Sequence, residues 1–273
     1  MNAPTSASAP SPATSRPLAA EGRVLLVTGG SRGIGAATAL RAAEAGWHVA
    51  VHARQAQGRA EDVAQAVRAR GRQACVLTAD VAREDEVVGL FGALDRWVAS
   101  LPGARLGGLV HSAGIVDAAQ PVADMSGERL RRMVDTNVLG TMWCAREAVR
   151  RLSTARGGAG GALVLLSSAA SRLGSPGQYV DYAATKAAVD TFTLGLAREV
   201  ATEGVRVNAV RPGIIDTEIH ASGGQPDRAW QLAPQVPMRR PGTAEEVAHA
   251  IVWLLSDEAA YTTGALLDVS GGR

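Results

Sequence analysis

The chain has little cysteine, almost no lysine and few aromatic residues. Only Cys75 and Cys144 occur among its 273 residues, which is too few for a disulfide framework or a zinc site built from cysteines. We expect both thiols to be small, buried, apolar side chains. Such cysteine usage is typical of a reducing compartment, so a cytoplasmic protein is expected.

Long hydrophobic runs and a strong charge imbalance are also missing. No uninterrupted apolar stretch reaches the roughly 18 residues that a transmembrane helix needs, so no membrane partner is expected. The 28 basic and 26 acidic residues leave a formal net charge of +2, too small to indicate a nucleic-acid partner. With 47% hydrophobic and 20% charged residues, the composition is that of a globular protein.

The first 20 residues differ in composition from the rest of the chain. They consist mainly of Ala, Pro, Ser and Thr, with Arg16 and no acidic residue. They lack the apolar core of a secretory signal, and one arginine is weak support for a transit peptide. We therefore expect a disordered tail at residues 1–20 and one folded domain at residues 21–273.

From Gly22 onward, short β-branched runs alternate with longer segments that carry apolar residues at helical spacing. This alternation predicts an α/β fold, a single Rossmann-type doubly wound domain with a mostly parallel seven-stranded sheet and helices on both faces. The strands are predicted at residues 24–28, 49–51, 74–77, 109–111, 162–167, 205–210 and 265–269, and the helices at 36–45, 60–70, 87–99, 130–152, 189–201 and 244–255.

Residues 217–241 lack this periodicity and contain Pro226, Pro234 and Pro237. A loop of this length predicts a lid over a substrate. Its apolar residues either line the substrate site or pack the lid onto the domain: Trp230, Leu232, Val236 and Met238.

A glycine-rich turn follows the first predicted strand. Residues 28–35 spell TGGSRGIG, and a predicted helix comes directly after them. Glycines at such a turn let the backbone approach a pyrophosphate, whose charge is stabilised by the helix N-terminus. The turn lacks the Gly-Lys-Ser/Thr ending of a P-loop, which argues against ATP or GTP hydrolysis.

The end of the second predicted strand indicates which dinucleotide would bind. An NAD site is expected to place an acidic residue there to bond the ribose 2′-hydroxyl, but Ala53 and then Arg54 occupy this region. Together with Arg32 in the turn, Arg54 could flank a 2′-phosphate. NADP(H) is therefore favoured over NAD(H), the alternative being that both arginines are only solvated.

Tyr182 and Lys186 are four residues apart, which places them on one helix face. A phenol exchanges protons poorly at neutral pH unless a cation stabilises its phenolate, and a neighbouring ammonium would do so. Lys186 is the only lysine in the chain, which indicates a need for a compact ammonium rather than a guanidinium. The alternative is an exposed Tyr–Lys pair in a chain that simply uses little lysine.

On these residues the chain resembles the short-chain dehydrogenase/reductase family, from about Gly22 to its C-terminus. The TGGSRGIG turn, the Tyr182–Lys186 pair and the segment NAVRPG at residues 208–213 occur in the family's order. The resemblance implies an NAD(P)-dependent oxidoreductase that transfers a hydride between a nicotinamide cofactor and a small carbonyl or secondary-alcohol substrate, without a metal. A non-catalytic dinucleotide sensor is the alternative, although it would be expected to lose the Tyr–Lys pair.

The resemblance also implies which residues act. Tyr182 would protonate the substrate oxygen, Ser168 would hold it, Lys186 would lower the tyrosine pKa, and Asn137 would support a proton relay. Ser167 and Ser171 are lesser candidates for the serine. The implied cofactor-binding residues are Gly29, Ser31, Arg32, Gly33, Ile34, Gly35, Arg54, Asp80, Val81, Ala113, Gly114, Tyr182, Lys186, Pro212, Gly213, Ile215 and Thr217.

Three further expectations follow from the resemblance. His111 and Ser112 replace two asparagines of the family pattern, and His111 is expected to be structural. Tyr179 is not the catalytic tyrosine, because Ala183 rather than lysine follows four residues later. The helices around Asn137 and Tyr182 should pair across two-fold axes into a homotetramer, unless their apolar residues face the sheet instead: Val138, Met142, Val189 and Leu194.

Overall fold

The computed structural model describes residues 22–55 and 57–273, so the tail expected at residues 1–20 lies outside the described residues. The described part forms one domain around a seven-stranded sheet with strand order β3-β2-β1-β4-β5-β6-β7. Every pairing is parallel, so the sheet is more uniform than the mostly parallel one predicted. The strands are β1 (Arg23–Thr28), β2 (His48–Ala53), β3 (Ala74–Thr78), β4 (Arg105–His111), β5 (Gly161–Leu166), β6 (Val205–Pro212) and β7 (Leu266–Val269).

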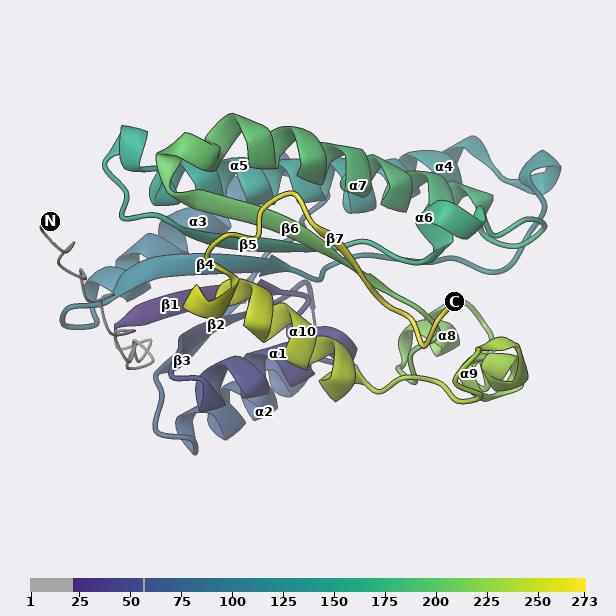
Figure 1. Ribbon diagram of the computed structural model, residues 1–273, viewed down its shortest axis with the longest axis horizontal. Helices are drawn as coiled ribbons and strands as arrows, with labels where there is room; N and C mark the ends of the chain where they lie inside the picture. The colour runs from purple at the N-terminus through teal and green to yellow at the C-terminus, as the bar shows by residue number, and fades with distance from the viewer. Residues whose placement is uncertain (1–21, 56) are drawn as a thin grey trace, which may run out of the picture.

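Helices cover both faces of this sheet. In Figure 1, α1, α2 and α10 lie on one face, while α3, α4, α5 and α7 lie on the other. The shorter helices α6, α8 and α9 gather near the chain's C-terminal residue at one end of the molecule (Figure 1). The helices are α1 (Gly33–Glu44), α2 (Gln57–Arg68), α3 (Glu84–Ala99), α4 (Gly127–Val134), α5 (Gly140–Leu152), α6 (Ala170–Leu173), α7 (Val180–Val200), α8 (Ile219–Ser222), α9 (Arg228–Leu232) and α10 (Ala244–Leu255).

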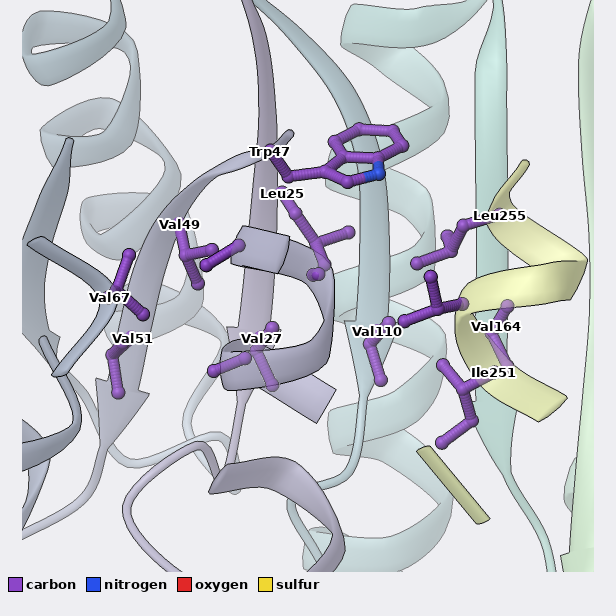
Figure 2. Packing of buried hydrophobic residues seen from close by; sticks show 14 of the residues in the cluster. Leu25, Val27, Trp47, Val49, Val51, Val67, Val110, Val164, Ile251 and Leu255 are labelled. Carbon is purple, nitrogen blue, oxygen red and sulfur yellow. The ribbon is translucent and has the colours of Figure 1, made fainter. Parts of the chain in front are cut away.

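The sheet is buried on both faces, which explains why its strands are apolar without alternation. In β1, Leu25 and Val27 belong to one core cluster, while Val24 and Leu26 belong to the other, and all four are fully buried. Figure 2 shows part of the first cluster, in which Trp47 and Ile251 lie among aliphatic side chains from the strands. The strand order reverses between β1 and β4, and parallel sheets of this kind bind ligands at the carboxyl ends of the strands there.

The helix predicted at residues 130–152 is interrupted. A π-helical turn at Asp135–Leu139 separates α4 from α5, and apolar periodicity at 3.6 residues does not reveal such an insertion. Helix α7 begins at Val180, nine residues earlier than predicted, because its first turns contain alanines that give no clear apolar stripe. Among the described residues, none of the helices combines the length and apolar character that crossing a membrane requires.

Candidate active site

A cavity of about 630 Å³ opens at the carboxyl end of the sheet. Residues that directly follow β1, β2, β3 and β6 contribute to its wall, including Gly29, Arg54 and Gly213. The predicted site residues that line the cavity are Gly29, Ser31, Arg32, Gly33, Ile34, Arg54, Asp80, Val81, Ala113, Gly114, Ser168, Tyr182, Lys186, Pro212, Gly213, Ile215 and Thr217. Gly35 and Asn137 lie behind this wall.

The glycine-rich turn leads into α1 with its backbone donors facing an anion site. The N-cap residue is Arg32, which provides no side-chain cap, and the first turn of α1 contains no acidic residue. Gly29 has φ +65, and a Cβ there would lie 2.8 Å from the Ala113 nitrogen, while one at Gly35 would lie 2.2 Å from the Gly29 oxygen. The turn therefore fits a dinucleotide pyrophosphate at the N-terminus of α1. Because Gly35 has no side chain, the turn can pack directly against this helix.

His52 braces this turn from the neighbouring strand. Its Nδ1 accepts from the Gly29 N–H at 3.3 Å, and its Nε2 lies 3.0 Å from the Ala79 carbonyl oxygen. These partners assign the neutral tautomer with the proton on Nε2. Burial lowers the pKa of His52, although its hydrogen bond to Ala79 opposes the shift, so the ring stays neutral at pH 7.

Three arginines surround the expected adenosine end of the cavity, which is the part between the glycine turn and the ends of β2 and β3. Arg54 Nη1 lies 3.9 Å from Asp80 Oδ2, and Arg32 Nη1 lies 3.5 Å from Glu218 Oε2. Arg59 on α2 donates to the same Glu218 oxygen at 2.6 Å, and this hydrogen bond holds the pKa of Glu218 below its usual range. Three guanidinium groups thus face two carboxylates, which leaves a positive excess for a 2′-phosphate.

Arg59 and Glu218 were missed by the sequence analysis. Arg59 follows no motif and stands in a chain whose 28 basic residues are all arginine except Lys186. Glu218 comes from the predicted lid, 159 residues away from Arg59. Only the folded chain brings these two side chains together.

Ser168 and Tyr182 meet in the middle of the cavity wall. Both residues line the cavity, and the Ser168 hydroxyl opposes the rise in the pKa of the Tyr182 phenol that burial causes. Ser168 Oγ accepts from the Ala170 N–H at 3.1 Å. Ser167 points the other way, because its hydroxyl donates to the Lys186 carbonyl at 3.1 Å. Of the three candidate serines, the geometry therefore favours Ser168.

Lys186 lies beneath the tyrosine and is tied to β5. Its Nζ donates to the Leu166 carbonyl at 2.6 Å and lies 5.6 Å from the centroid of the Tyr182 ring. Burial lowers the pKa of Lys186 to about 8, while Asp190 opposes this shift.

The expected lowering of the Tyr182 pKa is not observed. Burial raises the pKa of Tyr182, and only the hydrogen bond from Ser168 opposes that shift. The physical reason is that partial burial at the cavity wall disfavours the charged phenolate, while the neighbouring ammonium donates to the Leu166 carbonyl and not to the phenol. The phenol is therefore protonated at neutral pH.

Asn137 lies in the π-helical turn and fixes the loop that follows β4. Its Oδ1 accepts from the Ile115 N–H at 2.8 Å, and its Nδ2 donates to the Ile115 carbonyl at 3.0 Å. Nδ2 also lies 3.2 Å from Thr185 Oγ1 on α7. A Cβ at Gly114 would lie 3.2 Å from Asn137 Oδ1 and 3.6 Å from Lys186 Nζ, so these three residues pack at one point.

His111, which departs from the family pattern, braces the ends of β1 and β4. Its Nδ1 lies 2.9 Å from Thr28 Oγ1, and that oxygen accepts from the Ala113 N–H at 3.3 Å. Burial, reinforced by Lys186 and His52, lowers the pKa of His111 to about 3. A neutral, buried ring with Nε2 unpartnered among the described residues is structural, as the sequence predicted.

A buried ion pair next to Tyr182 was not predicted. Arg129 on α4 donates to both carboxylate oxygens of Asp181, at 2.8 and 3.2 Å, and the two side chains are only 6% and 3% exposed. Arg129 also donates to the Ala118 carbonyl at 2.6 Å and to Gln120 Oε1 at 3.0 Å. The pair joins the start of α7 to the loop after β4, and nothing distinguishes either residue in the sequence.

The substrate end of the cavity lies past Ser168 and Tyr182. Residues of α6, of the segment that precedes α7, of the predicted lid and of the end of the chain line it. These are Leu173, Ser175, Tyr179, His220, Gly223, Arg228 and Arg273. Of the two alternatives for the apolar lid residues, lining the site is not observed, because Trp230, Leu232, Val236 and Met238 are not among the residues that line the cavity. Leu232 and Val236 pack against Ile214, whereas Trp230 and Met238 are exposed.

Known proteins resemble this chain over nearly its whole described length. A family model described as enoyl-(acyl carrier protein) reductase matches residues 29–273. The Escherichia coli (strain K12) protein "uncharacterized oxidoreductase YgfF" is 51% identical over 250 residues, covering 92% of this chain and 99% of that protein. The Arabidopsis thaliana "NADPH-dependent aldehyde reductase-like protein, chloroplastic" is 35% identical over 266 residues, covering 94% and 96%. A crystal structure of a short chain dehydrogenase from Burkholderia cenocepacia J2315 in complex with NADP superposes with a TM-score of 0.82 at 31% identity, covering 93% and 98%.

Proposed function

The chain belongs to the short-chain dehydrogenase/reductase family of NAD(P)-dependent oxidoreductases, and we propose that it reduces a carbonyl compound with NADPH, or oxidises the matching secondary alcohol with NADP⁺. The observation that carries this proposal is the convergence of three predicted groups on one cavity wall. Ser168, Tyr182 and Lys186 all line the cavity, and Lys186 Nζ lies 5.6 Å from the centroid of the tyrosine ring. A non-catalytic dinucleotide sensor is the alternative.

The nicotinamide cofactor supplies or accepts the hydride, and the chain's own residues handle the proton. In reduction, the Ser168 and Tyr182 hydroxyls both donate hydrogen bonds to the substrate oxygen, and Tyr182 gives its proton to the developing alkoxide. The raised pKa of Tyr182 keeps that proton in place at neutral pH. Because burial disfavours the phenolate left behind, a counter-charge is needed once the proton has gone, and the Lys186 ammonium, 5.6 Å from the ring centroid, would supply it. The Asn137 amide fixes the Ile115 backbone.

A preference for NADP(H) over NAD(H) is supported by the arginines at the adenosine end. Arg32, Arg54 and Arg59 exceed the carboxylates there by one charge, and no acidic residue occupies the end of β2 at Ala53. The two relatives whose names mention a cofactor point the same way, one being bound to NADP and the other named as NADPH-dependent.

We also propose a homotetramer that acts in the cytoplasm. Leu130 and Val134 on α4 are 40% and 44% exposed, and Val138, Met142 and Leu194 are partly exposed beside them. Val189 takes no part, because it is buried in the chain's own core. Light scattering should give about four times the 28.1 kDa of one chain, and a mass near 28.1 kDa at micromolar concentration would refute the tetramer. Cys75 and Cys144 are both free thiols, which fits a reducing compartment.

The function is tested by following NADPH absorbance with a panel of aldehydes and ketones. We expect at least one compound to be reduced by the wild type and not by Tyr182→Phe. Thermal stabilisation by NADPH in both proteins, with no reduction of any compound by the wild type, would instead support the sensor.

A further inference from the structure

The arginines that line the cavity fall into two groups with different partners. At the adenosine end, Arg32, Arg54 and Arg59 each lie within 4 Å of a carboxylate. At the substrate end, Arg228 and Arg273 also line the cavity, yet neither forms an ion pair with any carboxylate in the described part of the chain. Asp80 and Glu218 are the acidic residues of the cavity lining, and both are engaged at the other end.

Arg228 is held in position by neutral groups. It is the first residue of α9 in the predicted lid, and its guanidinium lies over the Tyr179 ring, 5.1 Å from the centroid. Its Nη2 donates to Gln178 Oε1 at 2.8 Å. The side chain is partly buried and lines the cavity. Because both of these partners are neutral, they leave its charge unbalanced.

Arg273 approaches the same place from the end of β7. Its backbone oxygen accepts from Arg172 Nη2 at 3.1 Å and from Ser270 Oγ at 2.9 Å. Partial burial lowers the pKa of the Arg273 side chain, and the nearby charge of Arg228 lowers it further. Two guanidinium groups thus repel each other across a partly desolvated space, an arrangement that an anion between them would relieve.

Three acidic side chains of the surrounding elements bind other groups. Asp181 is bound to Arg129, and Asp268 lies 3.3 Å from Arg172. Asp216 accepts from the Trp230 indole at 3.0 Å. Among the described residues, no side-chain carboxylate lies within 4 Å of the Arg228 or the Arg273 guanidinium, so neither forms a side-chain ion pair.

We propose that the substrate carries an anionic group, a carboxylate or a phosphate, that binds between Arg228 and Arg273 while its carbonyl group lies at Ser168 and Tyr182. This inference rests on the proposed carbonyl reduction and adds the substrate class to it. Guanidinium groups recognise both oxyanions by paired N–H donors. Because Arg228 belongs to α9, binding of the anion also fastens the predicted lid over the reacting carbonyl.

Two matched pairs of probes test the proposal and separate the two sources of the anion. The compact pair is 4-formylbenzoate and its neutral methyl ester. The extended pair is acetoacetyl-coenzyme A, which carries phosphates, and the neutral acetoacetyl-N-acetylcysteamine. The quantity measured is the ratio of kcat/KM for the charged member to that for the neutral member, at saturating NADPH.

We expect the wild type to favour the charged member of one pair at least tenfold, and Arg228→Gln and Arg273→Gln each to reduce that ratio at least fivefold by raising KM. A preference within the first pair identifies a carboxylate, and one within the second pair a phosphate. The control is Arg239→Gln, an exposed lid arginine that does not line the cavity, which should keep the wild-type ratio.

Ratios near one in both pairs, or ratios that survive both substitutions, would overturn the inference. Turnover of the neutral members in that case would leave the proposed carbonyl reduction standing. Failure of all four probes, in contrast, would count against the proposed function together with the inference, and the broader carbonyl panel would then decide the function by itself.

Discussion

The two ends of the cavity are built from different parts of the chain. The adenosine end consists of strand ends and the N-terminus of α1, which the sheet fixes in place. The substrate end consists of short helices, connecting segments and the final residue. At the first end the arginines have carboxylate partners, whereas at the second Arg228 and Arg273 have none among the described residues. The arginines of the adenosine end are therefore largely, though not fully, balanced by carboxylates of the chain, whereas those of the substrate end have no side-chain carboxylate within 4 Å.

The largest effects are expected where the two ends meet. Tyr182→Phe removes the acid–base group, and Lys186→Arg replaces a compact ammonium that bonds the Leu166 carbonyl with a larger planar group. Both should lower kcat by about 10²-fold or more, while NADPH still stabilises the protein in a thermal melt. If Lys186→Arg retains most of the wild-type kcat, the unique lysine is an accident of composition.

The pH dependence of reduction should identify the same lysine. Because the pKa of Lys186 is lowered to about 8, its positive charge is present below pH 8 and is lost as the pH rises above it. The wild-type kcat should therefore be level below pH 8 and decline between pH 8 and 9.5. Lys186→Arg stays charged throughout this range and should show a lower but level profile; an equal decline in this variant would assign the titration to another group.

Reversing one charge at the adenosine end should change the cofactor preference. The Arg54 guanidinium lies 3.9 Å from the Asp80 carboxylate, so Arg54→Asp places a second carboxylate beside the first. The new carboxylate repels a 2′-phosphate and can accept a hydrogen bond from a ribose hydroxyl. The ratio of kcat/KM for NADPH to that for NADH should fall at least tenfold, or about 1.4 kcal/mol. An unchanged ratio would mean that Arg54 is only solvated, and the two ends would then differ less than the geometry indicates.

Removing a built-in counterion should have a smaller effect of the opposite sign. Glu218 occupies Arg59 at 2.6 Å and approaches Arg32 at 3.5 Å, so it competes with a 2′-phosphate for both. Since these side chains are about half exposed, Glu218→Gln should lower the Kd for NADPH by about two- to fivefold and leave the Kd for NADH nearly unchanged. The control is Glu245→Gln, which removes the same charge from an exposed position in the first turn of α10. Weaker NADPH binding by Glu218→Gln would instead show that Glu218 assists the cofactor.

The smallest effect concerns the stability of the wall behind the cavity. The pKa of His111 is lowered from 6.5 to about 3, so between these values the unfolded chain binds a proton that the folded chain does not. Stability should therefore fall as the pH decreases below 6.5. In His111→Asn the loss of Tm between pH 7 and pH 5 should be smaller than in the wild type, although His52 retains part of it. Parallel Tm curves for the two proteins would contradict this assignment.

The sequence predicted the fold and the cofactor end well, because both depend on local order along the chain. All seven strands occur where β-branched runs stand, and the glycine turn follows the first of them. The π-helical turn at Asn137, the Arg129–Asp181 pair and the role of Arg228 could not be predicted. Each depends on contacts between segments that are distant in the sequence. In a chain rich in arginine, nothing in the sequence identifies which group a given arginine contacts. For the same reason the sequence could not decide whether the apolar lid residues line the substrate site or pack onto the domain, and it gave no sign of the two arginines there.

The side chain and the backbone of Lys186 are both hydrogen-bonded to residues at the end of β5. Its ammonium donates to the Leu166 carbonyl, and its own carbonyl accepts from the Ser167 hydroxyl. These two bonds, one to Leu166 at the end of β5 and one to Ser167 directly after it, oppose rotation of α7 about its axis and sliding of α7 along the sheet. A helix that advanced by one residue would rotate its side chains by about 100°, and Tyr182 would then face away from Ser168. The direction of the phenol is therefore set by the register between α7 and the centre of the sheet, and it does not depend on the segment that follows β6.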